Sequence, residues 1–93
     1  MKTLHTVNKP GQPMALCIRA VADGDSVLLI EDGVYELLSS GKTIDTLPDN
    51  CSLLVLDVDA RARGVSVPEH IKAIGYDDFV TLSVDHDKVL SWF

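Results

Sequence analysis

Short β-rich runs alternate with helical segments along the whole chain, and this alternation constrains the fold more than any other feature. Residues 26–30 (SVLLI) and 52–56 (SLLVL) are almost entirely apolar, which is typical of strands that are covered on both faces. Further strands are predicted at residues 3–7, 72–75 and 89–93. Helices are predicted at residues 14–22, 33–39, 58–63 and 76–85. This order predicts an α/β fold, in which a mostly parallel sheet of about five strands carries helices on both faces.

The chain length of 93 residues allows a single domain, spanning residues 1–93, and leaves no room for a second core. Hydrophobic residues make up 46% of the chain, but its aromatic residues are only one Trp, two Tyr and two Phe. The core is therefore expected to be aliphatic. So much apolar content in so short a chain also leaves apolar side chains for an interface, which fits a subunit of a larger assembly.

The formal net charge of −6 argues against direct binding to nucleic acid, because an acidic surface repels phosphate. Arg61 and Arg63 lie close together, but Asp57 and Asp59 stand beside them. No apolar run approaches the roughly 20 residues that span a membrane, and the N-terminus lacks the apolar segment of a signal peptide. We therefore expect a cytoplasmic protein without membrane contact.

The second helix has the clearest local signals for its two ends. Asp32 is expected to cap the helix over residues 33–39 at its N-terminus. Gly41 is expected to end it, and residues 42–50 to follow as an exposed loop that is rich in turn-forming residues.

Ligands and partners of parallel sheets usually meet the loops beyond the carboxyl ends of the strands. In this chain those loops comprise residues 8–12, 31–33 and 57–59. Gly33 follows a strand and opens a helix, as a phosphate-binding glycine would, but the acidic residues directly before it would repel a phosphate. We therefore expect no nucleotide site and no bound cofactor.

The three histidines do not have the spacing of a zinc motif, and no cysteine stands near them at ligand spacing. No metal site is predicted. His5 lies in a strand that should be buried, so a hydrogen-bonded histidine in the core or at a sheet edge is expected. His70 and His86 stand among charged residues and are expected to be solvated.

Cys17 is the candidate for sulfur chemistry, because an accessible thiolate can accept sulfane sulfur as a persulfide. Its helical position also fits a small buried hydrophobic residue, because it shares the apolar face with Met14, Ile18 and Val21. Both interpretations stay open at this point. Cys51 is more exposed by pattern but has no basic neighbour to lower its pKa, so it ranks below Cys17. Neither thiol belongs to a CxxC motif, and both are expected to be reduced.

Several segments, in the same order along the chain, resemble the TusB/DsrH family. They are LHTVNK at residues 4–9, GDSVLLIEDGV at 24–34, LDVDARARG at 56–64, YDDFV at 76–80 and SW at 91–92. The likeness extends over nearly the whole chain. It implies the three-layer α/β/α sandwich of that family.

The resemblance also implies a function. TusB-like and DsrH-like chains are subunits of heterohexamers, together with TusC/DsrF-like and TusD/DsrE-like subunits. These complexes pass persulfide sulfur to a TusE/DsrC-like carrier, for 2-thiolation of the wobble uridine of tRNA or for intracellular sulfur oxidation. The principal sulfur-accepting cysteine of such complexes belongs to the TusD/DsrE-type subunit. DsrH members tend to carry a cysteine in the first helix, where Cys17 stands.

The resemblance thus leaves open whether this chain is itself catalytic. One hypothesis is an interaction subunit in which Cys17 plays no chemical part, and another is a sulfurtransferase in which Cys17 becomes a persulfide. A non-catalytic acidic adaptor or regulatory domain unrelated to sulfur transfer is the alternative outside sulfur chemistry.

Overall fold

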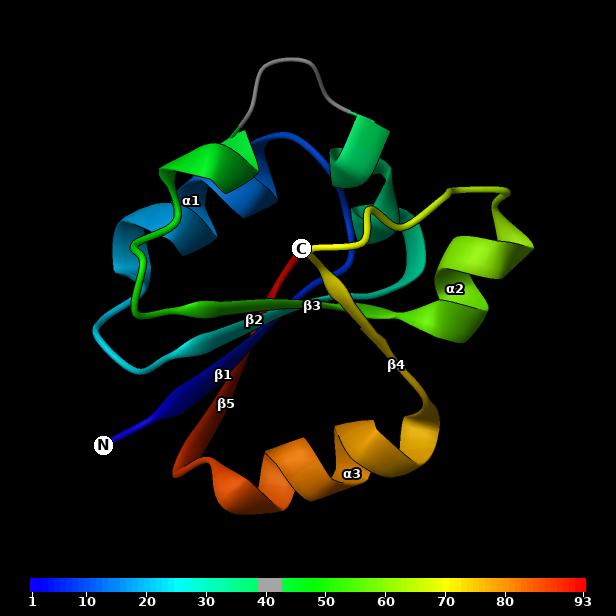
Figure 1. Ribbon diagram of the computed structural model, residues 1–93. Coiled ribbons are helices and arrows are strands. Elements are labelled where there is room, and N and C mark those ends of the chain that lie inside the picture. The colour runs from blue at the N-terminus through cyan, green and yellow to red at the C-terminus, as the bar shows by residue number, and fades with distance from the viewer. Residues whose placement is uncertain (39–42) are drawn as a thin grey trace.

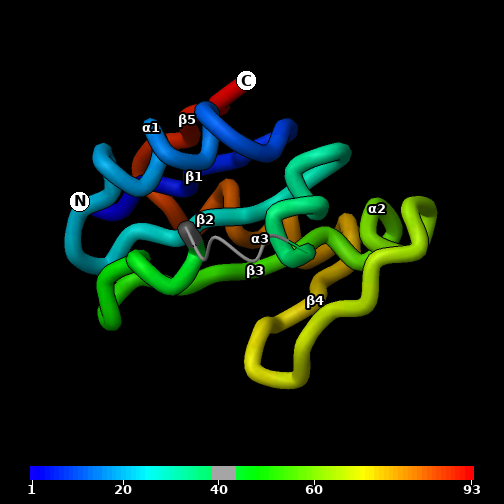
Figure 2. Tube along the Cα trace, turned by 90° about the horizontal axis from the view of Figure 1, so that it is seen from above, coloured from blue at the N-terminus to red at the C-terminus, as the bar shows by residue number. Residues whose placement is uncertain are grey.

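A five-stranded, wholly parallel sheet forms the centre of the protein, in a computed structural model that describes residues 1–38 and 43–93 (Figure 1). The strands lie in the order β4-β3-β2-β1-β5. They are β1 (Thr3–Val7), β2 (Ser26–Leu29), β3 (Ser52–Leu56), β4 (Lys72–Ile74) and β5 (Lys88–Trp92). Figure 2 shows the last strand, β5, beside the first, while β4 forms the opposite edge. The predicted parallel sheet of about five strands is confirmed.

The helical elements lie on both faces of the sheet, as predicted. They are α1 (Gln12–Ala20), α2 (Asp57–Ala62), α3 (Tyr76–Asp85) and the 3-10 helices η1 (Glu31–Leu38) and η2 (Thr43–Thr46). In Figure 1, α1, η1, η2 and α2 lie above the sheet and α3 lies below it. The expected α/β/α sandwich is therefore confirmed. The elements expected from the sequence agree with α1, α2, α3 and the five strands to within two residues at each end.

Alternate residues of the central strands supply two aliphatic layers, one on each face of the sheet. Val7, Val27 and Val55 pack with α1 in one layer, and all three are fully buried. Leu4, Leu28 and Leu54 belong to the other layer, where Phe79 and Leu82 of α3 pack against them. The core is aliphatic, as the composition predicts.

The second helix differs from the prediction. It is a 3-10 helix that begins at Glu31, so Asp32 lies in its first turn and does not cap it. Its apolar residues recur every three or four positions, a spacing that fits an α-helix and a 3-10 helix equally. The expected loop at 42–50 contains the 3-10 helix η2. Gly41 lies outside the described residues.

The prediction for His86 is wrong, because this side chain is buried at the end of α3. Its Nδ1 atom lies 2.7 Å from the carbonyl oxygen of Leu82, and its Nε2 atom lies 3.0 Å from Oγ of Ser26. A carbonyl oxygen can only accept, so Nδ1 carries the proton and Nε2 accepts from the Ser26 hydroxyl. The partner on β2 is 60 residues away, which is why the charged local sequence gave no sign of it.

Candidate functional site

The loops beyond the carboxyl ends of β2 and β3, where ligands were expected, are joined to one another by hydrogen bonds and ion pairs. The backbone N–H of Glu31 donates to the Asp59 carboxylate over 2.7 Å. Arg63, at the end of α2, donates from Nε to Asp32 over 2.8 Å and also lies 3.9 Å from Asp59. Both carboxylates thus have a cationic neighbour. The acidic residues of this edge hold η1 against α2.

Gly33 has a packing role at this edge. A Cβ atom at this position would lie 2.0 Å from the carbonyl oxygen of Val7, so no other residue fits without moving the backbone. Its N–H donates to the carbonyl of Ile30 over 2.8 Å. The amide is therefore already engaged within the chain, and the glycine serves the contact between η1 and β1.

Cys17 lies in the core on the sheet side of α1, with no exposed surface. It packs in the layer that contains Met14 and Val27. Burial, with smaller contributions from the charges of Asp25 and Cys51, raises the pKa of Cys17 to about 12. Because the thiolate is the nucleophile, a thiol with this pKa is unreactive at neutral pH in this conformation.

Cys51 is half-buried at the start of β3. Its Sγ atom donates to the carbonyl oxygen of Ala22 over 3.2 Å. Burial raises the pKa of this thiol above its ordinary value, and the nearby Asp25 and Asp23 add to the effect against two opposing backbone hydrogen bonds. Cys51 is the more exposed of the two cysteines, as the sequence predicts, but it is not activated.

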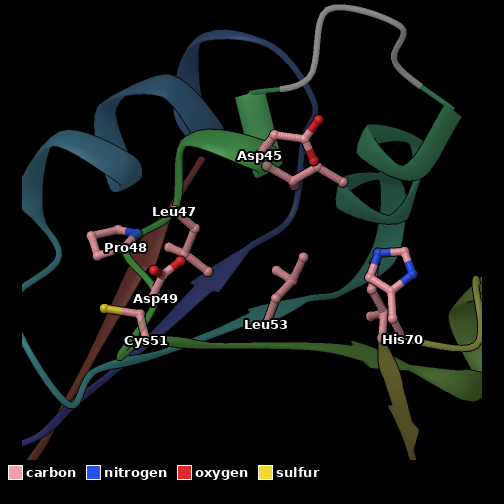
Figure 3. Close-up of a pocket in the computed structure, with 9 residues that line it drawn as sticks. Asp45, Leu47, Pro48, Asp49, Cys51, Leu53 and His70 are labelled. Carbon is pink, nitrogen blue, oxygen red and sulfur yellow. The ribbon is translucent and has the colours of Figure 1, made fainter.

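A cavity of about 260 Å³ lies beside Cys51, between η2 and the amino ends of β3 and β4 (Figure 3). The crossover helix α2 stands at the other end of β3, and among the described residues η2 and the loops around it cover this part of the sheet. The apolar part of the wall comes from Ile44, Leu47, Leu53 and Ile71.

The polar side chains of this cavity do not form a catalytic arrangement. Cys51 and His70 stand at opposite ends of the cavity, with Leu53 between them (Figure 3). His70 is exposed, as predicted. Asp45 and Asp49 also border the cavity. Within residues 1–38 and 43–93, no group of three or more His, Cys, Asp or Glu side chains is placed to hold a metal ion.

A chain of three hydrogen-bonded side chains joins β5, β1 and the start of β2, and two of its members, His5 and Asp25, are buried. Trp92 donates from Nε1 to Nδ1 of His5 over 3.0 Å, and Nε2 of His5 lies 2.9 Å from Oδ2 of Asp25. An indole nitrogen can only donate, so Nδ1 accepts and the imidazole proton sits on Nε2, facing the carboxylate. The prediction of a hydrogen-bonded core histidine is confirmed.

Asp25 is buried and gathers three donors. They are the backbone N–H groups of Thr3 and Ala22, each at 3.0 Å, and the His5 ring. Burial alone would raise the pKa of Asp25, but the hydrogen bonds from Ala22, His5 and Thr3 outweigh it and lower the pKa. Neither Asp25 nor its link to Trp92 was predicted from the sequence, because no local pattern marks either residue. Every polar atom of this chain of side chains has a hydrogen-bond partner within the protein, so its role is structural.

Comparison with known proteins places the sequence in a family. The family model described as "DsrH like protein" matches residues 10–89. The chain belongs to the TusB/DsrH family. Protein TusB of Enterobacter sp. (strain 638) is 37% identical over 79 residues, which cover 81% of this chain and 82% of that protein. Protein TusB of Pectobacterium parmentieri is 36% identical over 94 residues, which cover 96% and 99% of the two chains.

Solved structures support the fold of this TusB/DsrH family member. The crystal structure of the ychN protein from E. coli superimposes with a TM-score of 0.72 over 98% of this chain and 97% of that chain, at 14% sequence identity. The solution structure of protein Tm0979 from Thermotoga maritima gives a TM-score of 0.61 at 25% identity, over 88% and 92% of the two chains. At 14% identity, the likeness to the ychN protein concerns the fold alone. No helix among the described residues has the length and apolar character needed to cross a membrane.

Proposed function

We propose that this chain is a subunit of a cytoplasmic sulfur-relay complex, in which it assembles with TusC/DsrF-like and TusD/DsrE-like subunits. The complex delivers persulfide sulfur to a TusE/DsrC-like carrier. The observation that carries the proposal is membership of the TusB/DsrH family, with the family match extending over residues 10–89. The TusB name of the curated relatives favours wobble-uridine 2-thiolation of tRNA over sulfur oxidation as the destination of the sulfur.

The state of the two thiols supports an interaction role for this chain. Cys17 is buried with a pKa of about 12, and the pKa of Cys51 is also raised. A cysteine that accepts sulfur needs an accessible thiolate, which a basic neighbour or a helix N-terminus would normally stabilise. We therefore propose that the sulfur-accepting cysteine belongs to a partner chain. Cys17 could carry sulfur only after α1 moves away from the sheet.

Gene deletion in the native host tests the proposal. We expect loss of 2-thiouridine from tRNA hydrolysates, measured by liquid chromatography and mass spectrometry, and full recovery when the wild-type gene is restored. Unchanged 2-thiouridine with impaired oxidation of stored sulfur would instead assign the chain to the DsrEFH-type pathway. A deletion that affects neither process would contradict the sulfur-relay proposal and favour the acidic adaptor.

Complementation with Cys17→Ala separates the two roles of the cysteine in the same strain. Alanine removes the thiol and leaves a small apolar side chain in the core. Full recovery of 2-thiouridine is expected if the chain serves assembly. A variant that enters the complex normally but restores no thiolation would show that Cys17 handles sulfur.

A further inference from the structure

The surface of α3 carries apolar side chains that the fold leaves uncovered. Tyr76, Val80 and Val84 are 59%, 63% and 79% exposed. They recur at every fourth position, so at about 100° per residue they form one stripe within an arc of roughly 80°. Val89 of β5 pairs with Leu4 in the sheet, lies on the same side as α3 and is 43% exposed. We refer to these four residues as the α3 face.

The α3 face is distinct from the side of α3 that packs on the sheet. Phe79 and Leu82 make that contact, and no residue of α3 is fully buried. Thr81 and Asp78 line a hollow over β3 and β4, and at about 100° per residue they lie about 100° and about 160° around the helix from Val80. Figure 1 shows α3 alone below the sheet, with no other described element against its outer side. The stripe therefore has no partner among the described residues.

The helix α3 and the turn that follows it are acidic. Residues 76–87 contain four aspartates and neither Lys nor Arg. Asp87 accepts from the backbone N–H of Lys2, and Asp78 makes a long 3.5 Å contact with the N–H of Gly75. Within the described residues, none of the four aspartates forms an ion pair with a Lys or Arg. The ion pairs of Arg61 and Arg63 are with acidic residues outside α3.

We propose that the α3 face is the docking surface for a different protein subunit, whose contact surface has an apolar centre and a rim of Lys or Arg. A second copy of this chain fits poorly, because a symmetric contact would set the same carboxylates opposite one another. A basic rim would instead pair with aspartates that form no ion pair with any Lys or Arg of the described residues. Exposed apolar residues spaced by four along a helix are the usual anchors of helix-in-groove recognition. This inference rests on the proposed function, which supplies the candidate partners.

The experiment measures binding of the full chain to the preassembled TusC-like and TusD-like subunits of the same organism. Val80→Glu and Val84→Glu place a charge in the centre of the α3 face, and each is expected to raise the dissociation constant at least tenfold. Val58→Glu is the matched control, because it makes the same substitution at an exposed valine of α2, on the other face of the sheet. It is expected to change the dissociation constant less than twofold. Circular dichroism melting verifies that each variant folds.

A second pair of variants tests the charge of the rim. Asp85→Lys lies near the C-terminus of α3, where a cation suits the helix dipole, so it should fold well. It is expected to weaken binding several-fold at low salt, and the effect should shrink as salt is raised. Asp49→Lys makes the same change beside the cavity of Figure 3, on the other face of the sheet, and is expected to have little effect.

The outcomes separate the inference from the proposed function. If the wild-type chain does not bind these subunits, the proposed function fails and the inference fails with it. If the wild type binds and the α3-face variants bind as tightly as Val58→Glu, the function stands and the docking surface is wrong. The wild-type chain could instead associate with itself through the α3 face, and Val80→Glu would then abolish that association. This result would identify a second copy as the occupant and overturn the proposed contact with a different subunit.

Discussion

The indole N–H of Trp92 donates a hydrogen bond to Nδ1 of His5 over 3.0 Å, although 87 residues separate the two in sequence. The rings also stack, with centroids 6.1 Å apart and an interplanar angle of 24°. This contact fixes the tautomer of His5 and, through it, the donor that faces Asp25. It ties the last strand of the sheet to the first, at the edge where β5 pairs with β1.

Replacing Trp92 with Phe should lower the free energy of unfolding by about 1–2 kcal/mol, because Nδ1 of the buried His5 loses its donor. Urea unfolding followed by far-ultraviolet circular dichroism measures the change. Tyr76→Phe removes a hydroxyl from an exposed ring and serves as the control, with an expected change within about 0.5 kcal/mol. Equal effects of the two substitutions would argue against the hydrogen bond.

Asp25 should make stability depend on acid pH. Folding lowers its pKa below the ordinary value of 3.8, so the unfolded chain binds this proton more readily than the folded one. Asp25 therefore contributes fully to the free energy of unfolding when the pH is above its pKa in the unfolded chain. This contribution is lost as the pH falls through its pKa in the folded chain. Unfolding free energies measured between pH 7 and pH 2 should fall less steeply on the acid side for Asp25→Asn than for the wild type. An unchanged acid slope would contradict this assignment.

At pH 7, Asp25→Asn should lower the free energy of unfolding by about 3 kcal/mol. Three donors point at the carboxylate of Asp25, and the NH2 group of asparagine, itself a donor, would face one of them. Asp23→Asn is the matched control two residues earlier, on an exposed side chain. Its cost should stay within about 0.5 kcal/mol. A small effect of Asp25→Asn would show that the buried network contributes little to stability.

Gly33→Ala should lower the free energy of unfolding by about 3 kcal/mol or more, since its methyl group would collide with the carbonyl oxygen of Val7. The thermal midpoint is expected to fall by roughly 10–20 °C. Gly75→Ala is the control, because a Cβ atom there meets nothing within 4 Å and its φ of −93° suits any residue. If the two variants melt together, the close contact between η1 and β1 is not rigid.

The two thiols should differ in reactivity in the native protein. At pH 7, a thiol with a pKa of about 12 is in the thiolate form for only about one part in 10⁵, and Cys17 also has no exposed surface. Iodoacetamide should therefore modify Cys51 slowly and Cys17 only after unfolding, as peptide mass spectrometry of the alkylated protein would show. Denatured protein, in which both cysteines react, is the control. Rapid selective labelling of Cys17 in the folded chain would favour its role as a persulfide carrier.

Local sequence was sufficient to predict much of the fold. The apolar runs predicted β2 and β3, and the apolar face of α1 gave burial as one of two interpretations of Cys17. The 3-10 geometry of η1 could not be foreseen, because its apolar spacing suits an α-helix as well. The burial of His86 depends on Ser26, and the setting of Asp25 depends on His5, so both need contacts between distant segments.

The most direct test of the central claim is native mass spectrometry of the chain co-expressed with the TusC-like and TusD-like subunits of its own organism. We expect one assembly that contains two copies of each of the three chains, formed equally well by the Cys17→Ala variant. It would be contradicted if the two partner subunits assembled with each other while this chain remained a free monomer.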